Sequence, residues 1–91
     1  MQIRYSKHLV LRIKMRGIPY ELPRIVFKSP KHFYDNETDL NIAVLKTDFL
    51  GKRKNIMVAY RKNHYVLLIT VHPLKENQLE NRVKTGRWEE L

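Results

Sequence analysis

The segment between residues 55 and 72 constrains the fold more than any other part of the chain. Residues 55–62 and 64–72 are rich in β-branched and aromatic side chains that alternate as in strands. Only the tight RKNH turn separates the two stretches, so we expect an antiparallel hairpin. If the turn is centred on Lys62 and Asn63, Arg61 faces His64 and Arg53 lies opposite His72. This register predicts a core face made of Ile56, Val58, Tyr60, Tyr65, Leu67, Ile69 and Val71.

Two further strands are predicted upstream of this hairpin. Residues 31–35 form a short strand that suits a sheet edge, and residues 40–50 form a long one. The connecting turns DNETD and GKRK are short enough for antiparallel neighbours. The sequence therefore predicts a small antiparallel sheet of three to four strands over residues 31–72.

The N-terminal part predicts two helices. The first spans Ser6–Arg16, with Ser6 as N-cap and Gly17 closing it, and the second spans Pro19–Ser29 before Pro30. The tail at 74–91 is partly helical, with Gly86 as a break. We therefore expect a single α+β domain over residues 1–91, in which a helical hairpin at 6–29 packs on the sheet.

The charge indicates a polyanionic partner. Eighteen Lys and Arg residues against nine Asp and Glu give a net charge of +9 and an isoelectric point near 10. Nucleic acid or an acidic protein fits this charge, although a chain can also be basic without binding either. A membrane surface is disfavoured, since no helix divides cleanly into basic and apolar faces. With no signal peptide and no run of membrane length, a cytoplasmic location is expected.

Several classes of chemistry find no support in the sequence. The chain has no cysteine, and its four histidines show no paired metal-binding spacing. The DNETD turn lacks the glycine and the distal glutamate of a calcium loop, so a solvated turn is favoured. There is no glycine-rich phosphate loop, no serine nucleophile elbow and no carboxylate pair. Neither a metal nor a cofactor is expected.

A cationic stripe is predicted on the first helix. His8, Arg12 and Arg16 recur every four residues, whereas apolar residues cover the rest of the circumference. We therefore expect a helix buried on nearly all sides that presents this one strip. The alternative is that Arg12 and Arg16 pair with nearby carboxylates.

The second face of the predicted hairpin carries arginines and histidines. Such a face suits metal-independent RNA cleavage, in which cations stabilise the phosphorane and a histidine moves protons. His72, at the end of the last predicted strand, is the candidate acid or base. The alternative is a strand-end histidine that only hydrogen-bonds the backbone.

Three stretches carry a resemblance to a known family. HLVLRIKMRGI at 8–18, GKRKNIMVAYRKN at 51–63 and ITVHP at 69–73, in the order helix, helix, strands, resemble the RelE/ParE-like toxin superfamily, especially its BrnT-like branch and related uncharacterised domains. The resemblance covers residues 6–73. It implies a type II toxin that cleaves RNA, free or on ribosomes, without a metal, and that a small acidic antitoxin neutralises.

The resemblance also implies site residues. Lys46, Arg53 and Arg61 would stabilise the phosphate, with His72 as acid or base. The candidate RNA-binding residues, those of the tail included, are His8, Arg12, Arg16, Lys52, Lys54, Arg82, Lys84 and Arg87. The tail beyond His72 departs from the family pattern. It could cover the active face, grip RNA, or form a homodimer through Trp88.

Two other functions stay open. The superfamily includes gyrase inhibitors and inactive members, so fold alone does not decide activity. The chain could be a nucleic-acid-binding module without catalysis, in which many cations share the affinity. It could also be a protein whose basic face only meets an acidic partner.

Overall fold

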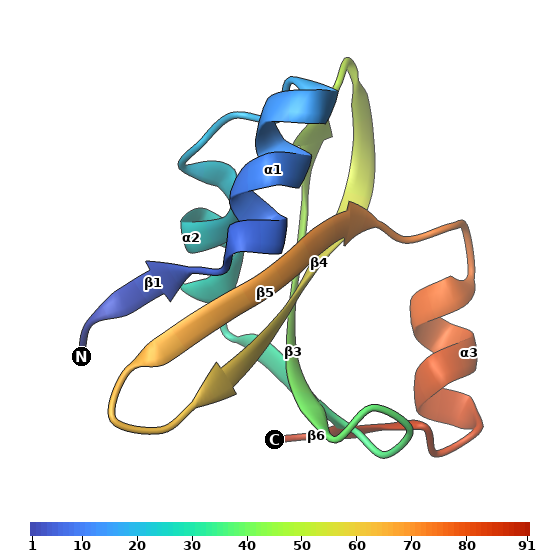
Figure 1. The fold of residues 1–91 in the computed structure, drawn as a ribbon. Coiled ribbons are helices and arrows are strands. Elements are labelled where there is room, and N and C mark those ends of the chain that lie inside the picture. The colour runs from blue at the N-terminus through green and yellow to red at the C-terminus, as the bar shows by residue number, and fades with distance from the viewer.

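A curved six-stranded sheet organises the chain, with three helices packed against it (Figure 1). The computed structural model describes all residues 1–91. The elements in chain order are β1 (Ile3–Tyr5), α1 (Lys7–Arg16), α2 (Leu22–Phe27), β2 (Lys31–Asp35), β3 (Leu40–Phe49), β4 (Lys52–Lys62), β5 (Val66–Pro73), α3 (Gln78–Lys84) and β6 (Trp88–Glu90). The α+β class is therefore confirmed.

The sheet is larger than the sequence predicted. Its strand order is β1-β5-β4-β3-β2-β6, and β1 runs parallel to β5 while all other neighbours are antiparallel. The expected three to four antiparallel strands are thus six strands in a mixed sheet. The two additional strands, β1 and β6, have three residues each, which is too short for a periodic pattern. Because β6 pairs with the outer side of β2, the strand predicted as an edge is an inner strand.

Helix α1 begins and ends where the sequence predicted. The Ser6 hydroxyl accepts a hydrogen bond from the Leu9 amide at 3.0 Å, and Gly17 closes the helix with φ at 63°. The expectation that this helix is buried on nearly all sides is wrong. Leu11 and Met15 are 57% and 76% exposed, so only one side of the helix faces the core.

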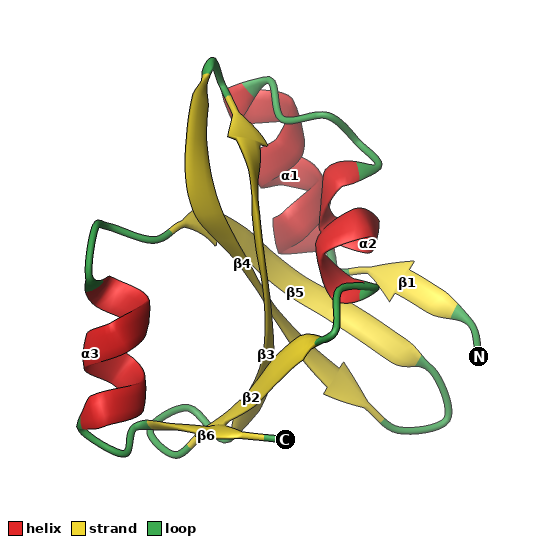
Figure 2. Cartoon of the chain, turned by 180° about the vertical axis from the view of Figure 1, so that it is seen from behind, coloured by secondary structure: helices red, strands yellow, loops and turns green.

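The sheet is covered on both faces (Figure 2). Helices α1 and α2 pack on one face over a core of Leu9, Ile13, Ile18, Leu22, Val26, Ala43, Phe49, Ile56, Val58, Tyr60, Val66, Leu68 and Val71. The opposite face holds a smaller core, against which Leu79 of α3 packs: Phe33, Ile42, Val44, Met57, Ala59, Leu74 and Trp88. The middle of the second face of the predicted hairpin, at Met57 and Ala59, is therefore buried, whereas Arg53 and Arg61 near its ends are exposed.

The register of the β4–β5 hairpin differs from the predicted one. Met57 lies opposite His72 and Ala59 opposite Thr70, and a β-bulge follows that pair on β5. Two features cause the difference. The connection is a wider turn, closed by a hydrogen bond of 3.0 Å from the Asn63 amide to the Tyr65 carbonyl, and the bulge adds one unpaired residue.

The bulge also changes which side chains of β5 enter the core. Val66 and Leu68 are buried, whereas the predicted Tyr65, Leu67 and Ile69 are only half-buried. An extra residue reverses the alternation of side chains along a strand, so the two halves of β5 follow opposite patterns.

None of the three helices is both long and apolar enough to cross a membrane.

Candidate functional site

The structure separates His72 from the two arginines that the resemblance implied as catalytic. His72 lies opposite Met57, while Arg53 and Arg61 are each four residues away from Met57 on β4, in opposite directions. At about 3.3 Å per residue, each arginine is displaced by roughly 13 Å along the strand. Arg61 lies opposite Leu67, near the other end of the hairpin. Neither arginine therefore stands beside His72.

Lys46 and Arg53 do come together, in a groove between the last part of β3, the start of β4 and the start of α3. This groove has a volume of about 530 Å³, and Lys54 also lines it. Two glutamates of the opposite wall, Glu76 and Glu80, share the groove with these cations. Arg53 in addition lies 3.8 Å from Asp48 in an exposed ion pair. The groove is therefore of mixed charge, and its cations are partly compensated.

The stripe on α1 is cationic, and no carboxylate forms an ion pair with its arginines. Its residues His8, Arg12 and Arg16 line a shallow surface groove of about 430 Å³ with Leu11 and Met15. The four ion pairs of the chain all involve other arginines, so the alternative in which Arg12 and Arg16 pair with carboxylates is wrong. The Arg12 Nε is buried and has no hydrogen-bond partner. An anion bound here would meet two free guanidinium groups.

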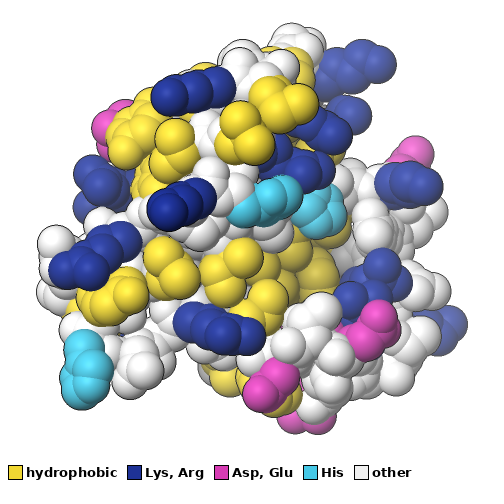
Figure 3. Space-filling model, in the orientation of Figure 1, with side chains coloured by type: hydrophobic (Ala, Val, Ile, Leu, Met, Phe, Trp, Pro, Cys, Tyr) yellow, Lys and Arg dark blue, Asp and Glu magenta, His cyan; other side chains and the backbone are white.

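His72 lies close enough to this stripe for its charges to act on it. Burial lowers the pKa of the His72 imidazole below its ordinary value of 6.5, and the charges of Arg12 and Arg16 lower it further. The hydrogen bond to the Pro73 carbonyl raises this pKa, but by less than the other effects lower it. Figure 1 shows why: the end of β5 lies between α1 and α3. We call His8, Arg12, Arg16 and His72 the cationic face. Figure 3 shows histidine side chains beside Lys and Arg side chains on this part of the surface.

The tautomer of His72 follows from its neighbour. Its Nδ1 lies 3.3 Å from the Pro73 carbonyl oxygen, and a carbonyl can only accept. The proton of the neutral ring is therefore on Nδ1, which leaves Nε2 with a free lone pair. A half-buried imidazole with a lowered pKa and a free Nε2 is a competent proton acceptor at neutral pH.

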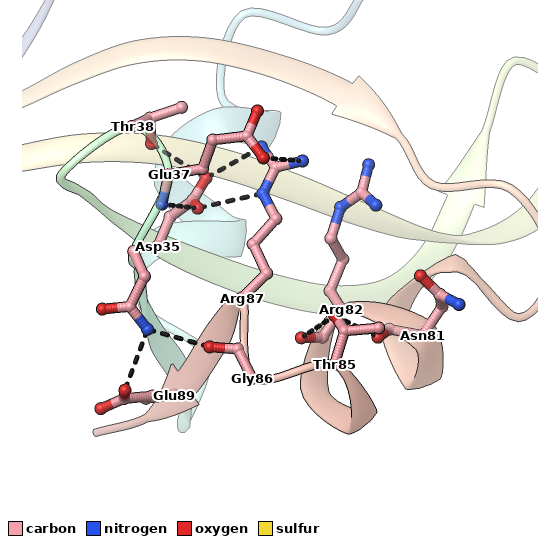
Figure 4. A network of polar contacts seen from close by, with 10 residues as sticks. Asp35, Glu37, Thr38, Asn81, Arg82, Thr85, Gly86, Arg87 and Glu89 are labelled. Carbon is pink, nitrogen blue, oxygen red and sulfur yellow. Dashed lines mark hydrogen bonds and ion pairs between the residues drawn. The ribbon is translucent and has the colours of Figure 1, made fainter.

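Three cations of the tail have different roles in the structure. Arg87 donates from Nε and Nη2 to the buried carboxylate of Asp35 at 3.1 and 3.2 Å, and its Nη1 lies 3.2 Å from Glu37 (Figure 4). Its guanidinium is thus held by two carboxylates. The guanidinium of Arg82 makes no such bond, and Lys84 is exposed on α3. Lys52, the first residue of β4, is exposed as well.

The Asp35–Arg87 pair was not found from the sequence. Asp35 opens the DNETD turn, where its carboxylate accepts from the Glu37 amide and the Thr38 hydroxyl. Burial raises the pKa of this carboxyl, but the bonds from Arg87, Glu37 and Thr38 outweigh it and lower the pKa to about 2. The pair fastens β6, and with it Trp88, to the second core. A turn aspartate is a local signal, but its partner is 52 residues away.

A second polar pair lies under α2. His32 Nε2 lies 2.8 Å from the Ser29 carbonyl, so in the neutral ring it donates there while Nδ1 accepts from the Tyr60 hydroxyl at 2.6 Å. Burial raises the pKa of that hydroxyl. The rings of Phe27 and Tyr60 pack edge-on at 4.9 Å, beside His32. Because every polar group of this pair has a partner within the chain, we assign it a structural role.

No cluster of three or more side chains suited to hold a metal ion is present. Comparison with known proteins finds no matching family model, no matching curated protein and no matching solved structure.

Proposed function

We propose that this protein is a cytoplasmic toxin of the RelE/ParE-like, BrnT-like kind that cleaves RNA without a metal and is neutralised by a small acidic antitoxin. The observation that carries the proposal is the cationic face. A half-buried histidine with a lowered pKa lies there within reach of the charges of two arginines that no carboxylate compensates. Two guanidinium groups without a carboxylate partner attract an anion to this face.

The cationic face can perform each step of RNA transesterification. His72 Nε2 takes the proton of the ribose 2′-hydroxyl, whose oxygen attacks the adjacent phosphorus. Arg12 and Arg16 stabilise the dianionic phosphorane, because guanidinium groups match phosphate oxygens in geometry and charge. The bond from phosphorus to the 5′-oxygen breaks, and that oxygen takes a proton from His8, the second imidazole of the face. The products are a 2′,3′-cyclic phosphate and a 5′-hydroxyl.

The proposal places catalysis on α1 and the end of β5 instead of on β4. Arg53, Lys46 and Arg61 then serve, if RNA reaches them, as distant contacts of the phosphate backbone. This assignment follows from the register, which displaces both β4 arginines from His72.

The test is cleavage of a short RNA in excess EDTA, with and without ribosomes. We expect wild type to leave 2′,3′-cyclic phosphate ends, and His72→Gln and Arg16→Gln to lose at least a hundredfold in rate. Arg53→Gln is the matched control, because it removes an exposed arginine outside the cationic face and should retain most of the rate. Equal losses in Arg53→Gln and Arg16→Gln would contradict the assignment.

A second function, a nucleic-acid-binding module without catalysis, is favoured by one observation. The cations are divided among the cationic face, the Lys46 groove and the hairpin end, as in a protein that follows a phosphate backbone. Binding that weakens steeply with salt, without cleavage in either condition, would support this function over the first.

A further inference from the structure

We propose that the exposed side of α1 is the docking surface for one α-helix of a partner protein, a helix with an apolar seam flanked by Asp and Glu side chains. The docked helix covers Arg12 and Arg16 and thereby blocks the cationic face. This inference rests on the proposed function, and it specifies where and by which element the acidic neutralising partner binds.

Two large apolar side chains of α1 face the solvent. Leu11 is 57% exposed and Met15 is 76% exposed, and they lie one turn apart on the same side of the helix. The residues that α1 buries against the sheet are Leu9 and Ile13. We call Leu11 and Met15 the α1 ridge. Because apolar surface gains free energy when it leaves water, this ridge favours a partner that covers it with apolar side chains.

Two surface grooves beside the ridge have the form that a second helix requires. One has a volume of about 430 Å³ and is lined by His8, Leu11, Arg12, Met15 and Arg16. The other has a volume of about 300 Å³ and is lined by Tyr5, Lys7, Val10, Leu11 and Lys14. Each groove contains four residues at the spacing i, i+3, i+4, i+7, which is the hole that receives one side chain of a facing helix in knobs-into-holes packing. A lipid bilayer has no side chains to place in such holes.

Cations border the ridge on both sides. His8, Arg12 and Arg16 lie along one side, and Lys7 and Lys14 lie along the other. Helix α1 contains no Asp or Glu, and none of the ion pairs of the chain involves it. Figure 3 shows hydrophobic side chains among Lys and Arg side chains on this part of the surface. A helix whose seam lies on the ridge brings its flanking side chains beside these cations, so carboxylates on both flanks complement the charge.

Other occupants match this surface less well. The phosphates of an RNA complement the cations but offer no apolar side chain to the ridge. A second copy of this chain has the same net charge of +9 and would bring one cationic helix against another. Only an acidic amphipathic helix satisfies the ridge, the holes and the charge together.

A designed peptide tests the surface directly. The seam peptide has about 20 residues, enough to form a helix, with a leucine seam flanked by glutamates. A scrambled peptide of the same composition keeps the charge and removes the seam. The readout is the ¹³C–¹H methyl signal of Met15, one of three methionines in the chain. We expect the seam peptide to shift this signal in a saturable manner and to bind at least about tenfold more tightly than the scrambled peptide.

Three results of this titration would overturn the proposal. The first is the absence of a saturable shift with the seam peptide. The second is equal affinity for both peptides, because charge alone would then explain the binding. The third is a Met15 signal that responds to phosphatidylglycerol vesicles and to neither peptide, which would assign the ridge to a membrane surface.

Variants of the ridge separate its contribution from that of the charges. Leu11→Gln and Met15→Gln keep every cation, and both should fold, because the positions are exposed and glutamine is a good helix former. Each should weaken the seam peptide about tenfold in isothermal titration calorimetry. Val83→Gln is the matched control, because it removes an exposed apolar side chain from α3 instead. Affinity that both ridge variants leave unchanged would contradict the assignment.

The failure of this inference differs from the failure of the proposed function. RNA cleavage in EDTA that a saturating concentration of the seam peptide leaves unchanged would overturn the docking surface and leave the nuclease. Saturable binding of the seam peptide that the ridge variants weaken, in a protein that cleaves no RNA, would support the docking surface and overturn the nuclease.

Discussion

The substitution Asp35→Asn tests how the C-terminal strand is held. The Asp35 carboxylate is buried and accepts two hydrogen bonds from Arg87 at 3.1 and 3.2 Å. Its pKa falls from 3.8 to about 2 on folding, which corresponds to about 2 kcal/mol of stability. We therefore expect Asp35→Asn to lower the free energy of unfolding at pH 7 by about 2 kcal/mol, a large part of what a domain of this size possesses.

The pH dependence has a definite sign. The folded-state pKa lies below the unfolded-state pKa, so the unfolded chain binds more protons and the stabilisation is present in full above pH 4. It is lost as the pH falls from about 4 towards 2. The difference between wild type and Asp35→Asn should therefore be largest at pH 7 and shrink across that interval.

Urea unfolding followed by Trp88 fluorescence measures this difference, because Trp88 follows Arg87 in the chain. Glu37→Gln is the matched control. It removes the Glu37 carboxylate, which is 67% exposed and whose Oε2 lies 3.2 Å from the Arg87 Nη1. Because this ion pair is exposed, the substitution should lower the free energy of unfolding by less than about 1 kcal/mol. A loss in Asp35→Asn no greater than in Glu37→Gln, or one that persists unchanged at pH 2, would show that the Asp35 carboxylate does not hold the C-terminal strand.

Three further predictions concern single side chains. Ser6→Ala should lower stability by about 1 kcal/mol in chemical denaturation, because its hydroxyl caps α1, and Ser6→Thr should restore most of it. Tyr60→Phe should cost about 1–2 kcal/mol in the same assay, because it leaves the His32 Nδ1 without a donor; an unchanged midpoint would contradict this. Arg16→Gln should reduce the slope of log RNA affinity against log salt by about 0.7–0.9, the value for one lost phosphate contact. An unchanged slope would show that Arg16 touches no phosphate.

Local signals were sufficient for the main elements. The Ser6 cap and Gly17 define α1, and the alternating stretches define β2, β3, β4 and β5 to within a few residues. The spacing of His8, Arg12 and Arg16 also placed the cationic stripe on one side of α1. These features depend on neighbours within one or two turns of the chain, and a single sequence contains that information.

The strand pairing could not be obtained in the same way. The width of the turn after Lys62 and the bulge on β5 are each a difference of about one residue, and a one-residue shift reverses which side chains enter the core. The sequence therefore placed Arg53 opposite His72, whereas the structure places Met57 there.

Long-range partners were also hidden. The strands β1 and β6 exist because longer strands offer them an edge, and the Asp35–Arg87 pair joins residues 52 positions apart. Three-residue segments carry no period, and an ion pair leaves no local pattern in the sequence. Both features become visible only when the tertiary fold is known.

We propose that His72 acts as a base that burial and the α1 arginines keep neutral. The most direct test is the pH dependence of the single-turnover rate of RNA cleavage in EDTA. We expect the wild-type rate to fall at acid pH with a midpoint below 6.5, and this midpoint to rise when Arg12 and Arg16 are both replaced by glutamine. His72→Gln should lose the acid limb altogether. A wild-type acid limb that persists in His72→Gln, or a midpoint that the double substitution leaves in place, would contradict the account.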